Sequence, residues 1–155
     1  PNEQYANAIA EVGRGHRKTD LFDEGFYPTD YELGDGNRAN LAMLAAVLRI
    51  ADELDVTSDR NPDLLYHIER MENLSEKDVF EFSKHEGIHT VEFAEDTVVI
   101  FADTDKPDIG EGIVIAARTI RQTLEYCVSV IEKRSDLCMG CKSVKLILNN
   151  KEVEV

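Results

Sequence analysis

The spacing of apolar residues changes at about residue 87, and this change constrains the fold more than any other feature. Before it, apolar residues recur every three or four positions, which is typical of amphipathic helices. After it, residues 89–94 and 97–102 are rich in β-branched and aromatic residues and predict a hairpin. A long helix over 109–134 and a last strand over 144–148 follow. We therefore predict an α+β fold, with a mainly helical first half and a β-β-α-β second half whose helix covers the sheet.

The first half is predicted to contain four helices, with one long loop between the first and the second. Asp35 or Asn37 is the expected N-cap of the second helix. Residues 19–37 are polar and interrupted by glycine and proline, so we predict a loop there. The expected domain organisation is a helical part over 1–86 and a small β-β-α-β part over 87–155. The predicted helices cover residues 2–15, about 38–55, 61–73 and 75–85.

Composition limits the classes of partner. The chain has 155 residues, which is enough for one domain with a core. Its formal net charge is -14, which argues against a general nucleic-acid or anionic-membrane surface. No apolar run approaches the length of a membrane span. Three cysteines without a disulfide framework favour a reduced, cytoplasmic protein, and Cys138-x-x-Cys141 is either a pair of free thiols, a redox pair or part of a zinc site.

Positive charge is concentrated at one place in this acidic chain. The stretch RGHRK, residues 14–18, contains Arg14, His16, Arg17 and Lys18. Arginine offers a bidentate fork to phosphate, and histidine can exchange a proton near neutral pH. The stretch is therefore a candidate phosphate site. It is equally consistent with basic residues that stabilise a helix C-terminus or pair with the acidic residues after it.

Two carboxylates are expected at or near the apolar face of the second helix. At 100° per residue, Asp55 falls inside the apolar stripe, Asp52 lies on its edge, and Arg49 and Glu53 fall on the polar side. A carboxylate directed at a core needs a cation or a hydrogen-bond partner. The partner is either a metal, Arg49 or the basic stretch, unless Asp55 ends the helix near solvent. The stripe consists of Leu41, Leu44, Val47, Leu48, Ala51 and Leu54.

The string LAMLAAVLRIADELD resembles the last motif of HD-superfamily domains, which are metal-dependent phosphohydrolases. AEVGRGHRKTDLF resembles the segment before that motif in two branches of the superfamily. One is the C-terminal domain of exopolyphosphatase and guanosine-pentaphosphatase proteins. The other comprises HD domains beside chaperone-like ATPase domains, and FEFSKHEGIHTVEF with the hairpin-helix-strand tail is more similar to this second branch.

This resemblance implies a function and a site. Asp52 takes the position of the final metal ligand, for Mn²⁺, Mg²⁺ or a similar ion. Arg14, Arg17 and Lys18 would bind the phosphate of a nucleotide or another phosphate ester, and His16 would bind phosphate or protonate a leaving group.

The family's His-Asp doublet occurs nowhere in the chain. We therefore expect the remaining ligands, and a neighbouring domain, upstream of Pro1. The alternative is a non-catalytic HD-like module that binds a nucleotide or a partner.

Overall fold

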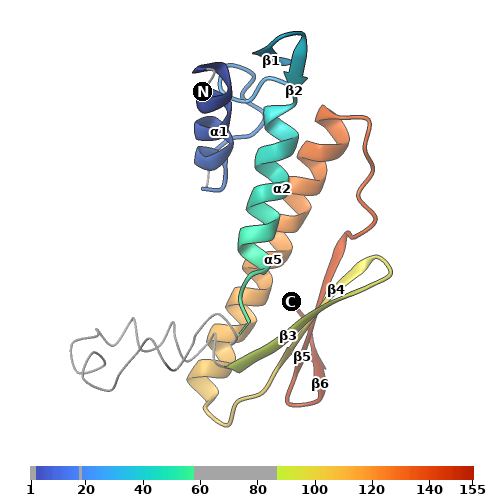
Figure 1. Cartoon of the computed structure of the whole chain (residues 1–155). Coiled ribbons are helices and arrows are strands. Elements are labelled where there is room, and N and C mark those ends of the chain that lie inside the picture. The colour runs from blue at the N-terminus through green and yellow to red at the C-terminus, as the bar shows by residue number, and fades with distance from the viewer. Residues whose placement is uncertain (1–2, 18, 58–86) are drawn as a thin grey trace, which may run out of the picture. The chain divides into compact units, whose positions relative to one another are not determined.

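The computed structural model describes residues 3–17, 19–57 and 87–155 (Figure 1). The predicted helices over 61–73 and 75–85 lie outside the described residues, as does Lys18. The α+β architecture is confirmed, since helices dominate the described first half and a four-stranded sheet with one helix follows. The chain divides into two compact units, one from Pro1–Glu53 with Gln122–Gly140 and the other from Leu54–Arg121 with Cys141–Val155.

The first unit begins with α1, Glu3–Gly15, as predicted. Glu3 in its first turn and Arg14 in its last turn both complement the helix dipole. The next helix is α2, Leu41–Leu54. The third element is the C-terminal half of α5, whose full span is Pro107–Arg134.

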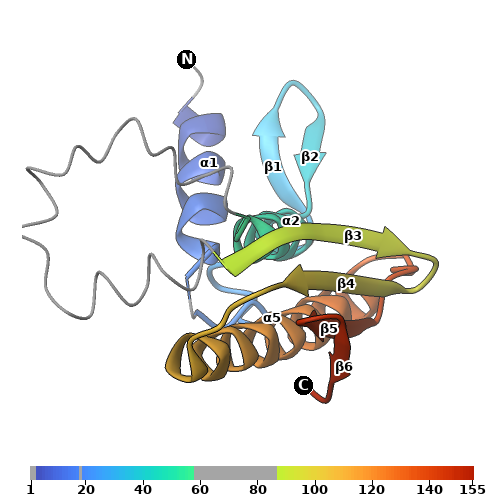
Figure 2. The same ribbon diagram turned by 90° about the horizontal axis from the view of Figure 1, so that it is seen from below.

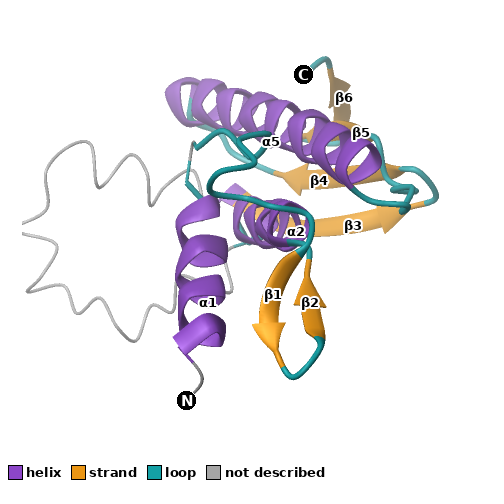
Figure 3. Cartoon of the chain, turned by 90° about the horizontal axis from the view of Figure 1, so that it is seen from above, coloured by secondary structure: helices purple, strands orange, loops and turns teal. Residues whose placement is uncertain are grey.

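A short hairpin replaces part of the predicted 19–37 loop. It consists of β1, Tyr31–Gly34, and β2, Asn37–Ala39, which pair antiparallel just before α2 (Figure 3). Asp35 and Gly36 form its turn with φ angles of 53° and 78°. Asp-Gly is a favoured sequence for such turns, because both residues tolerate positive φ. The loop prediction was therefore wrong for 31–37, since the turn signal outweighs the polar composition, and the helix predicted from about residue 38 begins instead at Leu41.

The N-cap of α2 is Asn40, and neither Asp35 nor Asn37. The Asn40 side-chain oxygen accepts a hydrogen bond from the Met43 amide at 2.9 Å, and its side-chain nitrogen donates to the Arg134 carbonyl at 2.6 Å. Asp35 lies in the hairpin turn and Asn37 in β2, so neither can cap the helix. Asn40 therefore closes the start of α2 and joins it to the end of α5.

The buried face of α2 differs from the predicted apolar stripe. Leu44, Val47 and Leu48 are 40%, 49% and 40% exposed. The buried face is built mainly from alanine, which allows neighbouring backbones to approach more closely than leucine does. The prediction gave weight to the large side chains, whereas packing selected the small ones. The buried residues of α2 are Leu41, Ala42, Ala45, Ala46 and Arg49.

Core packing in the first unit joins α2, the loop after α1 and α5. Leu21 and Tyr27 from the loop are buried with the alanines of α2. Cys127, Val130 and Ile131 from α5 complete the same cluster. The sequence assigned all of α5 to the sheet, but its C-terminal half packs here.

The second unit contains a four-stranded sheet in the order β3-β4-β5-β6. The predicted hairpin is confirmed as β3, Ile88–Ala94, and β4, Thr97–Ala102. The predicted last strand is confirmed as β5, Ser143–Leu148, which runs parallel to β4 because α5 forms the connection. The N-terminal half of α5 runs beside the sheet (Figure 2).

A final strand, β6, was not predicted. It spans Lys151–Val153 and pairs antiparallel with β5. Asn149 and Asn150 have φ angles of 51° and 61°, which makes a two-residue hairpin turn. A strand of three residues is too short for its alternation of apolar and polar residues to predict it, so only the turn could have indicated β6.

None of the helices in the described part of the chain has the length and apolar character needed to cross a membrane.

We expect Asn40→Ala to lower the free energy of unfolding by about 1–2 kcal/mol, because it removes the cap of α2. Asn40→Asp keeps the acceptor for Met43 but loses the donor to the Arg134 carbonyl, so its effect should be smaller. Asn37→Ala is the matched control, with an expected change below about 0.5 kcal/mol. Urea denaturation measures all three, and equal values for Asn40→Ala and Asn37→Ala would contradict this capping assignment.

Candidate functional site

The basic stretch begins where α1 packs directly against α2. A Cβ atom on Gly15 would lie 2.5 Å from the Ala45 Cβ, 3.1 Å from Tyr27 and 3.3 Å from Leu21. No side chain larger than hydrogen fits there without movement of the helices. The pairing of Gly15 with Ala45 therefore fixes the end of α1 on one side of α2.

Arg49 forms hydrogen bonds with main-chain carbonyls within this stretch and just after it. Its Nε donates to the Gly15 carbonyl at 2.8 Å, and its Nη2 donates to the Thr19 carbonyl at 2.8 Å and lies 3.2 Å from the Thr19 hydroxyl. Arg49 is 8% exposed, so the prediction that it lies on a polar side of α2 was wrong. A guanidinium has enough donors in one plane to bond two carbonyls at once.

Within the described part of the chain, main-chain carbonyls, a hydroxyl and an aromatic ring stabilise the charge of Arg49. Among residues 3–17, 19–57 and 87–155, its hydrogen bonds go only to neutral acceptors. The guanidinium carbon lies 5.2 Å from the centre of the Tyr126 ring, within the range of a cation–π interaction. Burial raises the pKa of the Tyr126 hydroxyl. That hydroxyl accepts a hydrogen bond from the Leu21 amide at 2.7 Å and lies 3.1 Å from an Asp20 carboxylate oxygen.

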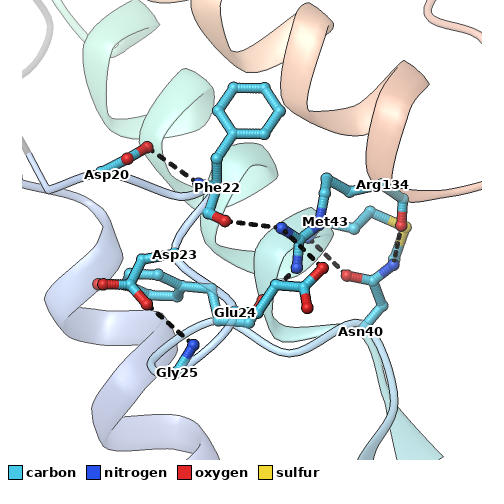
Figure 4. Close-up of polar contacts among 9 residues, drawn as sticks. Asp20, Phe22, Asp23, Glu24, Gly25, Asn40, Met43 and Arg134 are labelled. Atoms are coloured by element: carbon cyan, nitrogen blue, oxygen red, sulfur yellow. Dashed lines mark hydrogen bonds and ion pairs between the residues drawn. The ribbon is translucent and has the colours of Figure 1, made fainter.

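A second arginine, Arg134 at the end of α5, holds the following part of the loop. Its Nη1 donates to the Phe22 carbonyl at 2.8 Å and its Nη2 to the Tyr27 carbonyl at 3.0 Å (Figure 4). The exposed Glu24 carboxylate lies 3.7 Å away. Arg49 thus binds the carbonyls of Gly15 and Thr19, and Arg134 binds those of Phe22 and Tyr27.

The side chains of the basic stretch differ in exposure. Arg14 is exposed and forms an ion pair with Glu11 at 3.1 Å. His16 is half-buried, and its Nδ1 contacts the Gly13 carbonyl, so Nδ1 carries the hydrogen of this bond. Arg17 is exposed. Within the described residues, the Arg17 side chain and the Nε2 atom of His16 take no part in the hydrogen bonds that hold the backbone.

The carboxylates of α2 are not buried together. Asp52 is exposed, and Asp55 is half-buried beyond the end of the helix at Leu54, so the expectation of Asp55 within a buried stripe was wrong. Asp52 follows Ala45 by seven residues, which places it on the same side of α2 and about 10 Å further along the axis. Glu53 is half-buried and accepts a hydrogen bond from the Thr123 hydroxyl at 3.4 Å.

The part of the chain that the structure describes contains no group of three or more His, Cys, Asp or Glu residues that could hold a metal ion. Asp52 alone cannot hold a divalent cation tightly, because such sites need several oxygen or nitrogen ligands. The described residues therefore do not fit a complete metal site.

The sequence contained a signal for Arg49 that was not used. Arg49 is the single charged residue within the apolar run Leu41–Ala51. A charge in such a run on a buried helix requires bonded partners. The close approach of Gly15 to Ala45 has no comparable signal, because it depends on how two helices cross.

Comparison with known protein families shows which family the chain belongs to. The HD-CE family model matches residues 1–137. The chain belongs to the HD-CE family. It is therefore an HD-type domain, as the RIADELD motif on α2 indicated. No curated protein and no solved structure matches the chain.

The three thiols of this HD-CE domain are free in the structure. Cys138 is exposed, Cys141 is half-buried, and Cys127 lies in the core of the first unit. Burial raises the pKa of Cys127 from 9.0 to about 11, against a smaller opposite effect of the Arg49 charge. At neutral pH the buried thiol is thus protonated and acts as a small apolar side chain.

This pKa predicts a loss of stability at high pH. Between pH 9 and about pH 11 the unfolded chain releases the Cys127 proton while the folded chain retains it. The free energy of unfolding should therefore fall by up to about 1.4 kcal/mol per pH unit from this group. Cys127→Ala should remove that part of the slope in urea denaturation at several pH values, whereas Cys138→Ala should not. Identical slopes for the wild type and Cys127→Ala would contradict the assignment.

Proposed function

We propose that this HD-CE domain binds the phosphate group of a nucleotide or another phosphate ester at residues 14–18, as part of an HD-type metal-dependent phosphohydrolase. One observation carries the proposal. The contact between Gly15 and Ala45 supports it, because it brings the start of the basic stretch to the side of α2 on which Asp52 also lies, about 10 Å further along the axis. This is the juxtaposition that a phosphate-binding role for the stretch requires.

The side chains of the stretch are suited to an anion. Arg17 is exposed and can approach a phosphate with two parallel donors. Arg14 shares its guanidinium with Glu11 in an exposed ion pair, which a phosphate can replace at small cost. His16 offers Nε2, either to bind phosphate or to protonate a leaving group.

Asp52 would supply one metal ligand in this function. Because the described residues hold no complete ligand group, the other ligands must come from elsewhere in the protein. The same observation favours a second candidate, a non-catalytic module that binds a nucleotide or phosphate and regulates a neighbouring domain. Both candidates share the anion site and differ in whether hydrolysis occurs.

Charge reversal tests the anion site. Arg17→Glu should weaken the binding of inorganic phosphate by less than about 1 kcal/mol, up to about fivefold, because Arg17 is exposed. Lys151→Glu in β6 is the matched control, since it makes the same charge change at an exposed position in the other unit. NMR titration measures both affinities. Equal weakening by the two variants would show only a general charge effect.

Metal titration tests whether residues 1–155 hold a metal site of their own. For residues 1–155 alone, we expect Mn²⁺ affinity weaker than micromolar in calorimetry, because Asp52 is the one ligand of the family set that the chain supplies. Sub-micromolar binding at one stoichiometric site would contradict this.

In a longer form of the protein that carries a His-Asp doublet, Asp52→Ala should abolish metal-dependent hydrolysis of a phosphate ester, whereas Glu53→Ala should not. Absence of hydrolysis in that longer protein with added Mn²⁺ would favour the non-catalytic module.

A further inference from the structure

We propose that Arg49 is the positioning residue of the phosphate site, because it fixes the backbone on both sides of His16 and Arg17 and so restricts where their side chains can lie. This inference rests on the proposed phosphate binding. Arg49 itself is buried and bonded to the protein, so it acts through the residues that it holds.

The hydrogen bonds of Arg49 have a particular arrangement. One guanidinium donates hydrogen bonds to the carbonyl of Gly15, immediately before His16, and to the carbonyl of Thr19, the first residue after the stretch. Both distances are 2.8 Å. The Gly15 carbonyl is at the last residue of α1 and the Thr19 carbonyl is four residues further along the chain, so neither has a helical hydrogen-bond partner. A lysine at position 49 could keep the charge but could not reproduce this planar bridge.

The cost of Arg49 also points to a role beyond packing. Burial of the Arg49 cation costs free energy that an apolar side chain of similar size would not cost, and its hydrogen bonds within the described residues go to neutral acceptors. Neutral carbonyls and the Tyr126 ring compensate the charge without cancelling it. Arg49 therefore orders the stretch and leaves its positive potential available to an anion.

Gly15 and Ala45 set the distance that this bridge requires. Gly15 supplies one of the two carbonyls, and its contact with Ala45 brings that carbonyl within reach of Arg49 one turn further along α2. A methyl group at Gly15 would push the end of α1 away from α2 and lengthen the bond. Removal of the Ala45 methyl group would relieve the closest contact of that added methyl group, which is the one at 2.5 Å.

The test measures inorganic phosphate binding by NMR, using the amide signals of Gly15, His16 and Arg17. Arg49→Met and Arg49→Lys should both weaken binding by up to about fivefold, because the largest loss is that of the exposed Arg17 contact that Arg49 positions. They should also speed hydrogen exchange at 15–17 while the amides of α2 remain protected. If Arg49→Lys binds as tightly as the wild type, only the charge matters and the positioning role is overturned.

A second pair of variants leaves Arg49 in place and decides the question even if the Arg49 variants do not fold. Gly15→Ala should weaken phosphate binding, and the double variant Gly15→Ala with Ala45→Gly should restore it to within about twofold, since mutations in contact are strongly coupled. Undiminished binding by Gly15→Ala would overturn the inference. A wild-type protein whose 14–17 signals do not respond to phosphate would instead overturn the proposed function, whatever the variants do.

Discussion

Hydrogen bonds from two arginines to main-chain carbonyls organise the first unit of this protein. Arg49 of α2 bonds the carbonyls of Gly15 and Thr19, and Arg134 of α5 bonds those of Phe22 and Tyr27. A loop without regular structure leaves its carbonyls unpaired, and burial of such groups is costly. The two arginines remove that cost, and this allows Leu21 and Tyr27 to enter the core between the helices.

The same interactions place the candidate site. The basic stretch belongs to the backbone that Arg49 holds, and the contact of Gly15 with Ala45 sets its position along α2. The protein is strongly acidic overall, so a local group of cations that is fixed in space can bind an anion that the rest of the surface repels. The chain belongs to the HD-CE family and carries the exposed Asp52 on α2. These two features are the basis for proposing that the candidate anion site takes part in the hydrolysis of phosphate esters.

Much of the fold could be predicted because its signals are local. The period of apolar residues predicted α1, the β3–β4 hairpin, α5 and β5. The missed elements are short ones whose signal lies in the turn. Asp35-Gly36 and Asn149-Asn150 adopt positive φ and define the β1–β2 and β5–β6 hairpins, although the missed strands β1, β2 and β6 have only three or four residues and carry little pattern by themselves. The cap of α2 was misplaced by the same omission, since the hairpin occupies the residues that were expected to cap it.

The α+β class, the basic stretch and the HD-type motif could all be recognised in the sequence. Each depends only on residues that are close together along the chain. Only the tertiary structure decided which face of α2 is buried. Hydrophobicity favoured Leu44, Val47 and Leu48, but the close crossing of α1 at Gly15 selected the alanines and brought Arg49 inside with them. A helix with apolar residues on several sides has no unique buried face until its neighbours are placed, and steric fit between backbones then makes the choice.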